Sequence, residues 1–322
     1  MDRRKFIKVS AATAAAIELS RAESVASTLG NIPGSVASEG ISCENGVPGA
    51  EDLQLRFLGT GAASGWDTDH SKRRFSSVLL DRKVLIDLTD AALDLIPDGC
   101  RPEVIFYTHS HGDHYRPWVA LELGVKRVYV SETWIERAKA DFAKYAEELN
   151  AKGKAVSMPE FFPLVVGERV SEQGLVFLPL PGNHLTSDLK EQALIYVIEK
   201  GSTASRLGVR LLYATDTGGI TALAAKLAWS KERPITGFIM EATIGLGLEE
   251  DWRIFSHTTV ELCARTVRTL ADIGCYTPPT GQPPYATHMS RRGWASQSDL
   301  EYIFPKPLRP AYDGLEVTFR PM

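Results

Sequence analysis

Residues 108–114 read Thr-His-Ser-His-Gly-Asp-His, and this segment is the most informative part of the chain. It follows the apolar run Val104–Tyr107, which is typical of a strand buried on both faces. In an extended segment, residues two apart point the same way. His109 and His111 are therefore predicted to bind one metal ion together. Gly112 then allows the chain to turn.

After that turn, Asp113 and His114 can face a second ion beside the first. Imidazole and carboxylate are borderline to hard ligands, which suit Zn, Mn or Fe better than Cu(I). A His-rich surface loop is the alternative interpretation. The position of these ligands at the end of a buried strand favours a metal site.

The pattern His-x-His-x-Asp-His after an apolar strand resembles the signature of the metallo-β-lactamase fold superfamily. The resemblance covers nearly all of residues 53–320. It implies an α/β fold in a single domain, a four-layered αβ/βα sandwich. It also requires ligands further downstream, and the chain has candidates in the required order: His184, Asp216 and His288.

The resemblance implies two divalent ions, with Zn expected and Mn or Fe as alternatives. The implied ligands are His109, His111 and His184 for one ion, Asp113, His114 and His288 for the other, and Asp216 between both. A hydroxide bridging the ions would attack the substrate, and Asp113 would help to orient it. Asp87, which ends the apolar run Val84–Ile86, would hydrogen-bond to the metal-binding loop.

Three further features resemble the phosphodiesterase branch of the superfamily, which includes tRNA 3′-processing ribonuclease Z and the PhnP-type cyclic-phosphate phosphodiesterases. The Gly-rich segment 57–65 is similar to the opening motif of that branch. The resemblance gives His257, just before a predicted helix, the role of an acid that protonates the leaving group. Glu241, at the end of the preceding strand, would assist it. The ending 312–317 also resembles the last strand of the PhnP type.

Two departures weaken the assignment of a substrate. The stretch 66–71 contains His70 but no cysteine, so the structural zinc of the PhnP type is not expected. No counterpart of the tRNA-binding arm of ribonuclease Z is evident. The function predicted is hydrolysis of a small or cyclic phosphodiester (EC 3.1.4.-).

Other functions remain open at this stage. A hydrolase of the same fold could cleave a lactone or an amide. A non-hydrolytic member would resemble the pyrroloquinoline quinone biosynthesis protein B. A passive metal-binding protein would hold ions without turning over any ester.

Composition excludes several broader classes. The chain has 36 Lys and Arg against 40 Asp and Glu, with a net charge of −4, which disfavours a broadly basic nucleic-acid-binding protein. Its 44% hydrophobic content is that of a globular protein. No apolar run is long enough to span a membrane. The four cysteines lie far apart without a CxxC motif, which disfavours a disulfide scaffold.

The N-terminus resembles a twin-arginine export signal. Arg3 and Arg4 precede Phe6-Ile7 and an Ala-rich apolar run. The predicted organisation is a signal peptide at 1–30, a linker at 31–50 and a hydrolase domain at 51–322. We expect a periplasmic or secreted protein with a small-molecule phosphodiester substrate and no stable nucleic-acid partner. A homodimer remains open.

Periodicity predicts alternating strands and helices. Helices are expected at 132–150 and at 258–273, the latter capped by Thr258 with Glu261 at capping-box spacing. A hairpin is expected at 77–88. The remaining strands are expected at 53–58, 104–107, 125–130, 175–179, 193–198, 210–214, 237–240 and 315–319. The aromatic residues Trp66, Tyr115 and Trp118 are expected in the core rather than stacked on substrate.

Overall fold

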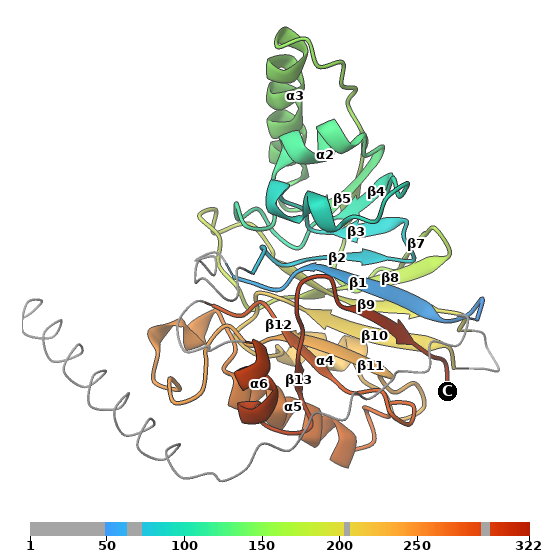
Figure 1. Cartoon of the computed structure of the whole chain (residues 1–322), viewed down its shortest axis with the longest axis vertical. Helices are drawn as coiled ribbons and strands as arrows, with labels where there is room; N and C mark the ends of the chain where they lie inside the picture. Colours follow the sequence, from blue (N-terminus) through green and yellow to red (C-terminus); the bar gives the residue numbers. More distant parts are fainter. Residues whose placement is uncertain (1–48, 63–72, 203–206, 291–296) are drawn as a thin grey trace, which may run out of the picture. The chain divides into compact units, whose positions relative to one another are not determined.

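The computed structural model describes residues 49–62, 73–202, 207–290 and 297–322, which belong to one unit spanning Val47–Met322. Two seven-stranded sheets form its centre (Figure 1). The first sheet has the order β14-β1-β2-β3-β4-β5-β6. Its strands are β1 (Leu53–Gly59), β2 (Ser77–Leu80), β3 (Val84–Ile86), β4 (Val104–Phe106), β5 (Arg127–Ser131), β6 (Glu160–Leu164) and β14 (Glu316–Phe319).

The second sheet has the order β13-β12-β11-β10-β9-β8-β7. Its strands are β7 (Val170–Glu172), β8 (Leu175–Pro181), β9 (Leu194–Lys200), β10 (Val209–Ala214), β11 (Gly237–Glu241), β12 (Tyr285–Thr287) and β13 (Arg309–Pro310). In each sheet one half is antiparallel and the other parallel: β3 to β6 are parallel in the first, and β10 to β13 in the second. The carboxyl ends of neighbouring parallel strands meet at one edge, which is where the predicted ligands lie.

Helices cover the outer faces of both sheets. They are α2 (Pro117–Leu123), α3 (Ile135–Ala151), α4 (Ala222–Ala228), α5 (Val260–Asp272) and α6 (Gln297–Ile303), with 3₁₀ turns η1 (Asp90–Leu95) and η2 (Trp252–Phe255). Phe142 of α3 packs with Val128 of β5 outside the first sheet. Val267 of α5 packs with Phe238 of β11 outside the second. These contacts give the layers helix, sheet, sheet and helix, and they confirm the predicted αβ/βα sandwich.

The innermost core lies between the two sheets. Phe106 of β4 stacks on Phe177 of β8 with ring centroids 3.9 Å apart, and both side chains are fully buried. Tyr196 of β9 meets Phe106 edge-on, with centroids 6.1 Å apart. Burial of a large side chain of this kind contributes roughly 1.5–3 kcal/mol. The ends of β4 and β8, which carry candidate ligands, are therefore anchored against each other.

The predicted strands and the hairpin are confirmed, with shifts of at most two residues at their ends. Sequence periodicity missed α2, α4, α6, β6, β7, β12 and β13, which are all seven residues or shorter. Helix α3 begins at Ile135 rather than Glu132 because Trp134 already has a non-helical backbone conformation. Tyr115 is buried as expected, whereas Trp118 is half-buried and packs on Tyr145 with centroids 4.9 Å apart.

The predicted cap of α5 is wrong. Thr259 is the N-cap, and its hydroxyl accepts a hydrogen bond from the Leu262 amide over 3.1 Å. The Thr258 hydroxyl instead donates to the Thr217 carbonyl over 2.5 Å and accepts from the Gly219 amide over 2.9 Å. These bonds to the loop after β10 occupy Thr258, so the helix starts one residue later.

Several predictions concern residues outside the described ranges. They are the export signal at 1–30, nearly all of the linker at 31–50, the end of the Gly-rich segment, Trp66 and His70. Within the described ranges, no helix combines the length and the apolar character needed to cross a bilayer.

Candidate metal centre

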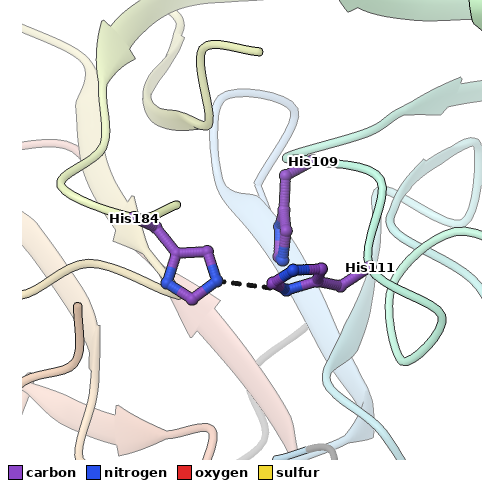
Figure 2. A group of neighbouring side chains, drawn as sticks. All are labelled: His109, His111 and His184. Atoms are coloured by element: carbon purple, nitrogen blue, oxygen red, sulfur yellow. Dashed lines mark hydrogen bonds between the residues drawn. The ribbon is translucent and has the colours of Figure 1, made fainter. Parts of the chain in front are cut away.

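Three histidines predicted to share one ion lie together. His109 and His111 come from the loop after β4, and His184 comes from the loop after β8 (Figure 2). One ligand atom from each can be chosen so that all lie within 4.8 Å of one another. His184 Nε2 is 3.1 Å from His111 Nδ1, and His109 is fully buried. The structure thus brings together a complete three-nitrogen set.

A second cluster adjoins the first and contains Asp113, His114, Asp216 and His288. Its ligand atoms also lie within 4.8 Å of one another, and all four residues are buried. Asp216 Oδ2 is 2.5 Å from His114 Nε2 and 3.1 Å from His288 Nε2. The carboxylate of Asp216 also lies near the first cluster, with Oδ2 at 3.7 Å from His109 Nε2. Its position between the clusters is the one expected of a shared ligand.

In four of the candidate histidine ligands, Nδ1 lies at hydrogen-bond distance from another protein group. The Nδ1 atoms lie at hydrogen-bond distance from the Thr108 hydroxyl for His109 (3.0 Å), Asp87 for His114 (2.7 Å), the Ser256 carbonyl for His184 (3.0 Å) and the Thr243 hydroxyl for His288 (2.8 Å). With Nδ1 as the donor, each Nε2 is left with a lone pair. This is the tautomer that a metal ligand requires.

Two buried polar atoms at the centre have no hydrogen-bond partner among the described residues. They are His109 Nε2 and Asp216 Oδ2. Such atoms are costly to bury unless a ligand satisfies them. Together with the nitrogen and carboxylate donors around them, they fit divalent ions of the Zn, Mn or Fe type.

The backbone at three site residues is unusual. Asp87, Asp216 and His288 follow β3, β10 and β12, and their φ angles are 56°, 46° and 52°. A positive φ is uncommon for residues other than glycine and costs of order 1–3 kcal/mol. The strain is concentrated where the side chains turn from the strand ends toward the centre.

The metal-binding loop is held from both sides. Asp87 accepts hydrogen bonds from the Thr108 amide (2.8 Å), the Thr108 hydroxyl (2.7 Å) and His114 Nδ1 (2.7 Å), as expected from the sequence. On the other side, Glu191 accepts from the amide and the hydroxyl of Ser110, both at 2.7 Å. Sequence reasoning missed Glu191, whose only signal is an acidic residue before an apolar strand.

Glu241 and His257 form a pair next to the second cluster. His257 Nδ1 is 3.1 Å from Glu241 Oε2 and 3.2 Å from Asp216 Oδ1. Burial by itself would raise the pKa of Glu241, but its contacts with His257 and His288 lower that pKa to about 2. Burial would lower the pKa of His257, whereas the two carboxylates outweigh this and raise it. The pair therefore favours a protonated His257.

A cavity of about 240 Å³ opens at these groups. Its lining comprises Ala62, His111, Asp113, His184, Asp216, Thr243, Arg253, His257, His288 and Ser290. Members of both metal-ligand clusters and His257 thus line one pocket, whereas Glu241 is fully buried and contacts His257 without lining that pocket.

Several solved structures resemble this chain. A diphosphatase from the PhnP family matches with a TM-score of 0.59 and 18% identity, over 84% of this chain and 98% of that one. The metallo-β-lactamase fold protein YhfI from Bacillus subtilis matches with a TM-score of 0.56 and 13% identity, over 83% and 99%. This chain has the metallo-β-lactamase fold.

A long-form RNase Z from yeast also resembles this metallo-β-lactamase-fold chain, with a TM-score of 0.51 and 14% identity. That match covers 86% of this chain and 43% of the yeast protein. No protein-family model and no curated protein matches the sequence.

Three residues that line the pocket were not predicted from the sequence. Thr243 lies between Glu241 and His288, and its hydroxyl contacts both. Arg253 and Ser290 also line the pocket. An isolated Thr, Ser or Arg carries no spacing signal, so sequence patterns could not have singled these residues out.

Proposed function

We propose that this chain is a dinuclear metal-dependent hydrolase that cleaves a small or cyclic phosphodiester. The observation that carries the proposal is that His257, which is paired with Glu241, lines one pocket together with members of both sets of metal ligands. The proposed ligands are His109, His111 and His184 for one ion, Asp113, His114 and His288 for the other, and Asp216 for both.

Two divalent ions bound there would supply Lewis acidity toward the phosphoryl oxygens and would lower the pKa of water. The side chains around the pocket would position the substrate and the attacking water. Asp113 lines the pocket, and its carboxylate can accept a hydrogen bond that orients an attacking water. Ligand residues held by the surrounding protein keep this arrangement rigid.

His257 is the proposed acid. Its Nδ1 faces Glu241, so its other nitrogen, Nε2, is available to donate a proton to the departing oxygen. Burial and the carboxylates on one side of the ring keep the imidazole in place. Acid assistance matters most for an alkyl leaving group, since an alkoxide is a strong base.

The structural similarity to a PhnP-family diphosphatase and to an RNase Z supports the phosphodiesterase branch. The resemblance of the segment 57–65 and of His257 in the sequence is a separate argument for the same branch. Export through the twin-arginine route is proposed as well. Replacing Arg3 and Arg4 by Lys should then leave the protein in the cytoplasmic fraction after cell fractionation.

The function is tested with protein loaded separately with Zn and with Mn. Bis-p-nitrophenyl phosphate, p-nitrophenyl phosphate, a lactone and a β-lactam are assayed in parallel. We expect metal-dependent cleavage of the diester alone. Cleavage of the lactone or the lactam without cleavage of the diester would indicate a lactone or amide hydrolase instead. Bound metal with no turnover of any substrate would indicate a passive metal-binding protein.

A further inference from the structure

The short helix η2 places two large apolar side chains in solvent beside the pocket. Trp252 and Phe255 are 77% and 79% exposed. In a 3₁₀ helix, residues three apart lie on the same face. Trp252 and Phe255 therefore lie on the same face of the helix, and Arg253, on a different face, lines the pocket.

This helix is tied directly to the metal centre. The carbonyl of Arg253 accepts from the His257 amide over 2.7 Å, and the carbonyl of Ser256 contacts His184 Nδ1 at 3.0 Å. Leu185 follows His184 and is 67% exposed. We call Leu185, Trp252 and Phe255 the apolar rim, because each lies within three residues of a group that lines the pocket.

Arg253 is oriented by its own helix. Asp251 accepts from Nε over 3.0 Å and from Nη2 over 2.8 Å, and it also caps the helix through the Arg253 amide at 2.9 Å. Nη1 makes no hydrogen bond within the described residues. A guanidinium held along one edge keeps its remaining donors in a fixed direction, which favours recognition of an anionic oxygen.

The pocket is too small to enclose a substrate with a bulky substituent. Its volume of about 240 Å³ is below the roughly 300–1,000 Å³ of pockets that enclose a drug-sized ligand. The pocket can hold a phosphoryl group, but a bulky substituent on that group must extend past the mouth. The exposed side chains of Trp252 and Phe255 belong to the same helix as Arg253, which lines the pocket.

We infer that Arg253 and the apolar rim select a phosphodiester anion that carries an aromatic substituent. Nη1 of Arg253 donates to a non-bridging phosphoryl oxygen, and the aromatic group packs on Trp252 and Phe255. This inference rests on the proposed function and adds a substrate class to it. Arg253 is a substrate-binding residue, and Asp251 is the residue that positions it.

The kinetic test compares phenyl p-nitrophenyl phosphate with methyl p-nitrophenyl phosphate, because both release the same leaving group. Metal-loaded wild-type protein should favour the phenyl ester in kcat/KM. The double variant Trp252→Ala/Phe255→Ala should lose about 10-fold of that preference, mainly through KM. Arg253→Gln should raise KM for both esters by a similar factor. Tyr302→Ala, which removes an 87% exposed aromatic side chain from α6, is the matched control and should retain the preference.

A binding test separates this inference from the proposed function. Titration calorimetry of the metal-loaded protein with phenylphosphonate and methylphosphonate requires no ester cleavage. Tighter binding of phenylphosphonate that the double variant abolishes would support the inference even if no diester were hydrolysed, in which case only the proposed function fails. Equal binding of the two phosphonates, or an unchanged preference in the double variant, would overturn the inference while leaving diester hydrolysis intact. Rim-dependent binding to lipid vesicles with equal phosphonate affinities would assign the rim to a membrane and would also overturn it.

Discussion

The carboxylate of Asp87 accepts the Nδ1 proton of His114 over 2.7 Å, and both side chains are fully buried. This contact directs His114 Nε2 toward the metal centre. Asp87→Asn should therefore lower metal affinity by roughly 10–100-fold, because the amide is a weaker acceptor and can present the wrong group. Competition with a chromophoric chelator measures the affinity. Asp98→Asn, on an exposed turn, is the control, and equal affinities in the two variants would refute the role of Asp87.

His257→Ala should keep its metal and slow turnover. If His257 is the acid, the loss in kcat on an alkyl diester should be about 10²–10⁴-fold. An activated aryl diester should be affected much less, since its leaving group scarcely needs a proton. Metal analysis and kinetics on both substrates make the comparison. A variant that matches the wild type on the alkyl diester would exclude the acid role.

Removal of metal should lower the melting temperature. The orphaned His109 Nε2 and Asp216 Oδ2 gain partners only when ions are bound. A ligand present at about 1,000 times its Kd stabilises a protein by about 4 kcal/mol. Thermal unfolding with Zn and after treatment with EDTA measures this difference. Asp216→Asn should show a much smaller response to EDTA, and an equal response in both proteins would place the stabilising ion elsewhere.

Thr259→Ala should destabilise the protein by about 1 kcal/mol, because it removes the side-chain cap of α5. Thr259→Ser keeps the hydroxyl and should recover most of the loss. Urea unfolding monitored by circular dichroism gives the free energies. Thr266→Ala, in the middle of the same helix, is the control and should not destabilise the protein. Similar values for Thr259→Ala and this control would contradict the assigned cap.

The strands and the ligand candidates were predictable because their signals are local. A buried strand such as β4 is a short apolar run, and the spacing of His109 and His111 shows that both face one side of an extended chain. His184, Asp216 and His288 also end or follow strands, which the family pattern requires. These features depend on neighbours in the sequence, so the sequence alone determined them.

Tertiary structure decided which remote groups complete the site. Thr258 could have capped α5 by its spacing, but its hydrogen bonds to the loop after β10 exclude it. Glu191 holds the metal-binding loop through Ser110, and Thr243 contacts the ligand His288; no periodicity marks either position. Arg253 reaches the pocket only because η2 lies against the loop of His184. A hydrogen bond between distant segments depends on how the two sheets bring strand ends together, and local sequence patterns do not encode that distance.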